Sequence, residues 1–209
     1  VLNTWQERLK QKGITPYPAC HIPLAIHSPE TTDNLRLELG ISEDILVFGR
    51  SSLSYAADTI NFTAFRQLAA PKTLFLAPAM SILQKKQTVN ISGLVYLSTI
   101  TSSLQMSKFY NTIDILIHDR GESFGCSVAE AIIHSKPVIS VGWSNGNFTA
   151  CNAQEELIQD SQYCASGSTL EEKISNYVGI MKRMVQGGRE YCKIEGKKFA
   201  ARTQWVLAS

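Results

Sequence analysis

The sequence predicts an α/β fold, in which a doubly wound parallel sheet carries helices on both faces. Short runs of β-branched and other apolar residues alternate with longer segments whose apolar residues recur at helical spacing. The clearest unit has apolar runs at 114–118 and 137–141, with a helical apolar stripe from Val128 between them. A strand, a helix and a strand in this order form a right-handed parallel crossover. The alternation along the whole chain therefore indicates a Rossmann-like sheet.

Glycines and a capping pattern give the expected ends of several helices. Gly13 and the pair Gly187-Gly188 are expected to break helices, and Ser168 begins a capping-box pattern that ends at Glu171. The expected strands are 45–48, 73–77, 94–97, 114–118, 137–141 and 161–165. The expected helices are 1–12, 31–39, 58–69, 104–111, a segment after residue 125, 152–160, 170–185 and 189–206.

Composition excludes several classes of protein. The net charge of +2 disfavours dedicated nucleic-acid binding, which needs a strong basic excess. No apolar run approaches transmembrane length, and the start of the chain shows no signal-peptide pattern. The five cysteines are scattered and form no C-x-x-C pair, which disfavours metal binding and indicates a reduced cytoplasmic compartment.

The loop between residues 118 and 125 is the candidate binding site. Ligands of open parallel sheets collect at the carboxyl ends of strands, where the next helix begins. Gly125 permits close backbone approach, and unpaired amides at a helix start suit an anion. Glu122 and Glu130 stand eight residues apart on either side of it. Amides that bind an anion and carboxylates that bind hydroxyl groups suggest a ligand that carries both phosphate and hydroxyl groups, such as a nucleotide sugar.

The same segment resembles the E-x7-E motif of family-4 retaining glycosyltransferases, which have the GT-B fold. The resemblance covers about half of the chain well and most of it loosely. Three stretches carry it: Glu122-Ser123-Phe124-Gly125 is similar to the family's E-G-F-G, Glu130-Ala131 to its E-A, and Lys136-Pro137-Val138-Ile139 to its G-K-P-V-I.

This resemblance implies transfer of a hexosyl or pentosyl group from a UDP-sugar or GDP-sugar to a hydroxyl acceptor such as a glycan. It also implies that neither a metal ion nor a further cofactor takes part, and the sequence contains no D-x-D. Glu122 would position the sugar, and Arg50 would neutralise the departing diphosphate. Glu130 would bind the ribose diol. The full set of implied nucleotide-sugar-binding residues is Gly49, Arg50, Ser123, Phe124, Gly125, Cys126, Ser127, Glu130 and Thr99.

The resemblance also implies a division of the chain into three parts. Residues 1–26 would be a helix and a proline-rich interdomain linker, and residues 27–186 the nucleotide-sugar-binding lobe. Residues 187–209 would form a basic helix that crosses to an N-terminal acceptor-binding lobe. A basic amphipathic helix is also compatible with peripheral contact with an anionic membrane. The chain begins at Val1 and not at a methionine, so we expect it to be a piece of a longer protein.

One departure from the family keeps a second hypothesis open. The family carries a lysine several residues after the arginine, whereas this chain has none between Arg50 and Lys72. That difference favours a non-catalytic module that holds a nucleotide sugar, or a subunit that needs a separate acceptor lobe. The intact E-x7-E pattern favours the enzyme. A sugar-nucleotide epimerase of similar fold is disfavoured, because its usual motifs differ.

Overall fold

A computed structural model describes residues 7, 9–15, 26, 29–51, 58–78, 92–97, 100–118, 125–141, 157–158 and 160–202. Within these residues, strands form one parallel sheet, which confirms the predicted fold class. All four residues of the central strands are buried, because helices cover both faces. The strands are β1 (Leu46–Gly49), β2 (Thr73–Pro78), β3 (Leu94–Leu97), β4 (Ile115–His118), β5 (Val138–Val141) and β6 (Cys164–Ala165).

The strand order places a reversal of chain direction at the middle of the sheet. The order is β3-β2-β1-β4-β5-β6, so the chain builds outward from β1 to β3 and then returns to start β4 beside β1. Phe48 of β1 lies opposite Ile115 of β4 in the register. The carboxyl ends of β1 and β4 are therefore the topological switch point, where open α/β sheets bind ligands.

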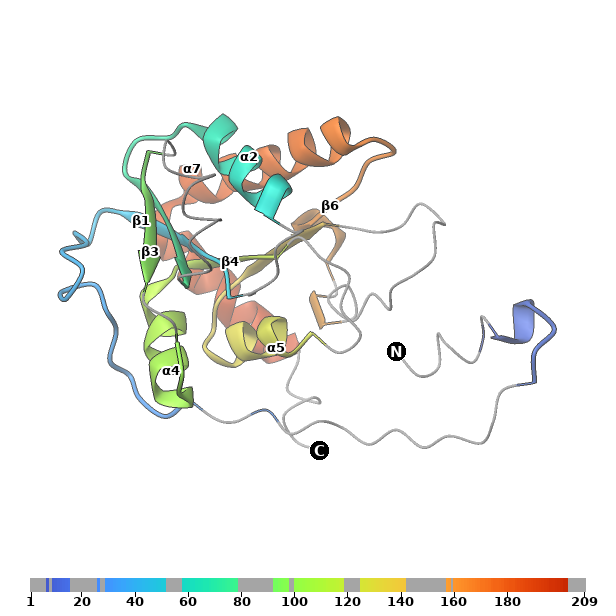
Figure 1. Cartoon of the computed structure of the whole chain (residues 1–209), viewed down its shortest axis with the longest axis horizontal. Helices are drawn as coiled ribbons and strands as arrows, with labels where there is room; N and C mark the ends of the chain where they lie inside the picture. The colour runs from blue at the N-terminus through green and yellow to red at the C-terminus, as the bar shows by residue number, and fades with distance from the viewer. Residues whose placement is uncertain are drawn as a thin grey trace.

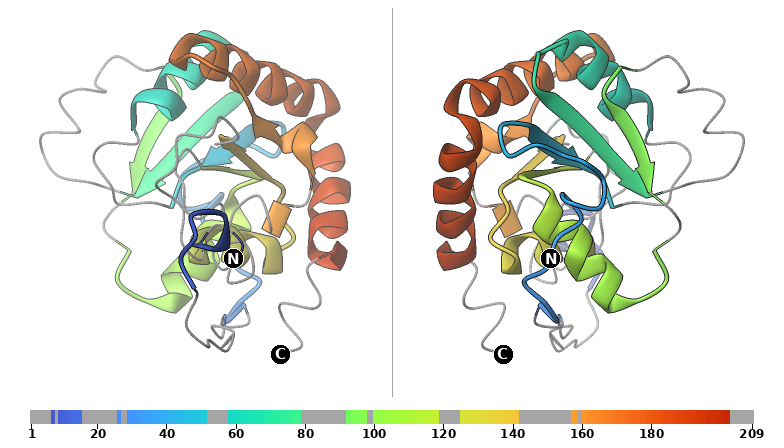
Figure 2. Two further views of the ribbon diagram at one scale, coloured as in Figure 1. Left: turned by 90° about the vertical axis from the view of Figure 1, so that its right-hand side faces the viewer. Right: turned by 90° about the vertical axis from the view of Figure 1, so that its left-hand side faces the viewer.

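Helices cover both faces of this sheet (Figure 1). Helix α2 (Asp58–Leu68) and the first half of α7 (Leu170–Arg202) lie together on one face, while α4 (Ser103–Thr112) and α5 (Cys126–Ile133) lie on the other. Figure 2 shows α7 running beside α2 and then turning past the sheet. The turn is at Gly188, which has φ 69° and ψ −174°, so the predicted break at the glycine pair is confirmed.

An aromatic cluster fills the space between α2 and the sheet. Phe62 and Phe65 of α2 pack against Phe75 of β2 with ring centroids 5.2 and 5.4 Å apart, and Phe65 also packs against Phe48. These rings are buried at the centre of the sheet, next to its switch point. Aromatic packing therefore fixes α2 on β1 and β2.

The expectation of a helix over residues 31–39 is wrong, because residues 31–35 are bends and irregular backbone and only residues 36–40 form consecutive turns. The Thr31 hydroxyl accepts a hydrogen bond from the Asp33 backbone N–H, and Asn111 of α4 donates to the carbonyls of both residues. Such side-chain bonds give the backbone an alternative to helical pairing. Leu37, which would belong to an apolar helix face, is 94% exposed.

The expected strand over residues 161–165 is only partly correct. A 3₁₀ helix, η2 (Ser161–Tyr163), takes the first three residues, and β6 is shorter than expected. The Asp160 carboxylate accepts a hydrogen bond from the Gln162 backbone N–H and so starts the 3₁₀ turn.

Several expectations fall largely outside the described residues. Of the expected helix over 152–160, the structure describes only residues 157 and 158 as helical. The domain boundaries also remain predictions, although α7 continues across residues 186–187. Among the described helices, none is both long and apolar enough to cross a membrane.

A buried ion-pair cluster ties α7 to the start of β4. The Asp114 carboxylate pairs with Arg36 at 2.6 Å and with Arg189 at 2.9 Å, and it accepts a hydrogen bond from the Val47 N–H. Arg189 also bonds Glu43, whose side chain is 82% exposed. Since Arg189 directly follows Gly188, the cluster fixes α7 at its bend.

Candidate functional site

Gly49 and Arg50 stand at the carboxyl end of β1, at the switch point. A Cβ atom on Gly49 would overlap the side chain of Ile113, so this position needs glycine because the packing is close. The Arg50 side chain is only 1% exposed, and its guanidinium carbon lies 6.0 Å from the centre of the Phe62 ring. An anion that reached this buried guanidinium would interact with it in surroundings of low dielectric constant.

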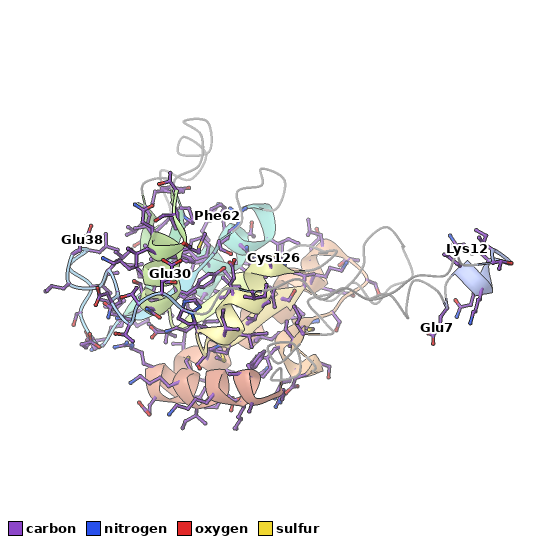
Figure 3. The ribbon with its side chains drawn as sticks, turned by 90° about the horizontal axis from the view of Figure 1, so that it is seen from below. Glu7, Lys12, Glu30, Glu38, Phe62 and Cys126 are labelled. Atoms are coloured by element: carbon purple, nitrogen blue, oxygen red, sulfur yellow. The ribbon has the colours of Figure 1, made fainter. Side chains whose placement is uncertain are left out.

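The start of α5 has the geometry that the sequence predicts for an anion site. Gly125 is its N-cap and takes the left-handed conformation, with φ 77° and ψ 44°, and no side chain of the described residues caps the helix. The first amides of a helix have no partner within that helix. Cys126 is exposed in this first turn, at the position marked in Figure 3. Helix α5 therefore directs backbone donors toward the switch point.

Glu130 lies on the second turn of α5 and is held by Tyr110 of α4. The Tyr110 hydroxyl donates to Glu130 Oε2 at 2.8 Å and to the Ser127 carbonyl at 3.2 Å. Burial, together with the charge of Glu130, raises the pKa of Tyr110 well above its usual value, so the phenol stays protonated. The predicted hydroxyl-binding carboxylate is thus fixed in position.

His134 packs beside this pair at the end of α5. Its ring lies 5.0 Å from the Tyr110 ring, and its Nδ1 is 2.7 Å from the Glu130 carbonyl oxygen. Burial lowers the pKa of His134, which favours the neutral imidazole. A pocket of about 50 Å³ between α4 and α5 is lined by Glu30, Ser103, Met106, Ser107, Tyr110, Glu130 and His134.

The structure brings together only part of the set that the sequence predicts. Gly49, Arg50, Gly125 and Glu130 gather around the switch point and α5. Cys126 and Ser127 occupy the first turn of α5, where Ser127 contributes its carbonyl to Tyr110. Glu122, Ser123, Phe124 and Thr99 lie outside the described residues.

Two residues of the site were not predicted. They are Tyr110 and His134. Tyr110 reaches Glu130 from α4 to α5, so no local motif reports this contact, whereas His134 contacts the Glu130 carbonyl within α5 itself. Among the described residues, no group of three or more His, Cys, Asp or Glu side chains could hold a metal ion. Metal independence remains a prediction.

Comparison with solved structures identifies the fold. The chain superimposes on sucrose-phosphate synthase from Thermosynechococcus elongatus with a TM-score of 0.70 and 12% identity, covering 98% of this chain and 52% of that one. It matches HepE from Anabaena, solved with UDP and glucose, with a TM-score of 0.60 and 16% identity, covering 99% of this chain and 59% of HepE.

The third comparison decides which part of such a protein is present. The C-terminal domain of the group 1 glycosyltransferase LpcC from Francisella tularensis matches with a TM-score of 0.56 and 12% identity. The match covers 87% of this chain and 95% of that domain. The chain has the fold of one GT-B lobe. It spans between half and three-fifths of the lengths of sucrose-phosphate synthase and HepE. The sequence matches no protein-family model, and no curated protein matches it.

Proposed function

We propose that this GT-B lobe binds a nucleoside-diphosphate sugar at the carboxyl ends of β1 and β4. The observation that carries the proposal is the uncapped, glycine-led start of α5 with Glu130 held close behind it. The amides suit the diphosphate, and the carboxylate suits the ribose diol. HepE, of the same fold, was solved with UDP and with UDP-glucose, and this supports the ligand class.

The proposed reaction is transfer of the sugar, with retention, to a hydroxyl acceptor held by a second lobe. Arg50 and the α5 amides would stabilise negative charge on the departing diphosphate, as preorganised donors do at developing anions. Glu122 would hold the sugar hydroxyls near the acceptor. With an arginine and helix amides in this role, we propose that no metal ion is required.

The first test is calorimetry of the chain with UDP and with GDP. We expect binding of at least one nucleotide, with the same affinity in the presence of EDTA, because the diphosphate would be neutralised by Arg50 and the α5 amides. Loss of binding in EDTA would refute the metal-independent site. Absence of binding of both nucleotides would refute the proposed function.

The second test separates the roles of the two glutamates. Glu130→Ala is expected to weaken UDP or GDP binding by about 2 kcal/mol, the value of hydrogen bonds to a charged group. Glu122→Ala should leave the free nucleotide unaffected and weaken only the nucleotide sugar. Glu190→Ala, an exposed change on α7, serves as the control. Equal losses for both site variants with the free nucleotide would contradict this assignment.

The non-catalytic module remains the second candidate. One observation favours it: the chain has no lysine between Arg50 and Lys72. Donor turnover separates the two candidates when it is measured on the longest natural reading frame that contains this chain, so that any acceptor lobe is present. Release of sugar from a bound UDP-sugar or GDP-sugar supports the transferase, whereas tight binding without release supports the module.

A further inference from the structure

Tyr110 is the buried hydrogen-bond donor that holds the Glu130 carboxylate. It is completely buried on α4, and its single hydroxyl proton is shared between Glu130 Oε2 and the Ser127 carbonyl. Both acceptors belong to the first two turns of α5. The hydroxyl therefore joins the carboxylate to the helix start that would hold the diphosphate.

The Tyr110 bond makes the two carboxylate oxygens of Glu130 unequal. Oε2 accepts the phenol proton, whereas Oε1 accepts no hydrogen bond in the part of the chain that the structure describes. Side chains on a helix lean toward its N-terminus, so Glu130 points along α5 toward the switch point. The oxygen that remains available is thus the one that a ligand hydroxyl can use.

The surroundings of Tyr110 keep this arrangement rigid. Its ring packs edge-on against the Phe109 ring, with centroids 5.4 Å apart, and lies tilted against the His134 ring at 5.0 Å. The His134 ring is in turn 2.7 Å from the carbonyl oxygen of Glu130. Figure 3 shows that the segment at Glu30 lies beside α4, and its backbone N–H bonds Ser107 one turn before Tyr110. A buried, packed donor of this kind loses no further freedom when a ligand binds.

We propose that Tyr110 is a positioning residue that selects ribose over deoxyribose by fixing the Glu130 carboxylate with one oxygen directed at the ligand. This inference rests on the proposed function. Glutamate is flexible, and immobilising such a side chain on binding lowers affinity by about two- to tenfold. Tyr110 removes that cost in advance, and it does so only for ligands that engage Glu130.

The test uses Tyr110→Phe, which deletes one oxygen atom and keeps the packing. UDP, 2′-deoxy-UDP and 3′-deoxy-UDP are the probes, with GDP analogues if GDP is the nucleotide that binds. The wild-type chain should prefer the ribose form, and the variant should lose about two- to tenfold of that preference. Its affinity for the deoxy form that lacks the hydroxyl bound by Glu130 should not change.

A double-mutant cycle shows whether Tyr110 acts through Glu130. In a Glu130→Ala background, Tyr110→Phe should have no further effect on UDP affinity. A second route leaves Tyr110 and its packing intact: Glu130→Asp shortens the side chain by about 1.5 Å, which breaks the bond from the other side and should also reduce the ribose preference. Wild-type preference in Tyr110→Phe would overturn the inference, whatever the result for Glu130→Asp.

The control is a second buried hydrogen bond between a tyrosine and a glutamate, which lies elsewhere on the lobe. Tyr163 donates to the buried Glu195 of α7, so Tyr163→Phe also removes a buried phenol–carboxylate bond. It should lower the melting temperature without changing the ribose preference. A shift of preference in this control equal to that of Tyr110→Phe would show a merely structural effect and overturn the inference. If the wild-type chain binds UDP or GDP and Tyr110→Phe keeps the full ribose preference, only the role of Tyr110 is refuted. If the wild-type chain binds neither nucleotide, the proposed function is refuted, and this inference with it.

Discussion

Replacing Asp114 by alanine is expected to destabilise the fold by about 3–5 kcal/mol, the range found when one partner of a buried ion pair is removed. The side chain is 5% exposed and serves three donors: Arg36, Arg189 and the backbone N–H of Val47. The variant leaves a buried guanidinium and a strand amide without their acceptor. Urea unfolding monitored by circular dichroism measures the loss.

Glu43 provides the matched control, because it pairs with the same Arg189 from an exposed position. Glu43→Ala should leave the free energy of unfolding almost unchanged, since solvent replaces the lost partner. If both variants unfold at the same urea concentration, the buried cluster contributes nothing special to stability. A loss confined to Asp114 would show that the link from β4 to α7 stabilises the whole sheet.

The second large expected effect comes from glycine-to-alanine changes at two sites of α7, which should change the stability of the lobe in opposite directions. A Cβ atom on Gly196 would overlap the Ser135 carbonyl oxygen in the turn between α5 and β5. Because backbone lies on both sides of this contact, α7 must shift away from the sheet. We expect Gly196→Ala to cost about 3 kcal/mol, the upper part of the usual range for overpacking.

Gly179 has open space around its Cα and normal helical geometry. Gly179→Ala should stabilise the lobe by about 0.5–1 kcal/mol, because alanine loses less backbone entropy in a helix. Thermal melts of the two variants beside the wild type provide the measurement. Destabilisation by both changes, or by neither, would contradict the packing of α7 described above.

Local pattern was sufficient to predict the sheet and where several candidate site residues lie on it. Buried parallel strands are continuous apolar runs, so β1 to β5 could be found from hydrophobicity alone. The break in α7 at Gly188 and the start of α5 at Gly125 could also be predicted, because each depends on the conformational freedom of a single glycine. Arg50 and Glu130 were placed at the switch point because the strand–helix order puts them there.

The remaining features depend on contacts between distant parts of the chain. Residues 31–39 do not form a helix, and Asn111, about 80 positions away, bonds the carbonyls of Thr31 and Asp33. Asp114 looked like the start of a strand, and its two arginine partners lie 78 and 75 residues from it. The Tyr110–Glu130 bond joins two helices. No periodicity or motif within a short window carries such information.

The path of α7 has a consequence for how this chain folds as it is synthesised. The helix packs on α2, which is made early, and also on α5, β5 and β6, which are made late. Of these partners, α2, α5 and β5 are made well before α7, and β6 is made shortly before it. Until residues 170–202 are made, the apolar surfaces that α7 covers on these elements stay uncovered. Domains generally fold as units, and such transient surface is prone to aggregation. Closure of the lobe must therefore wait until this bent helix has been synthesised.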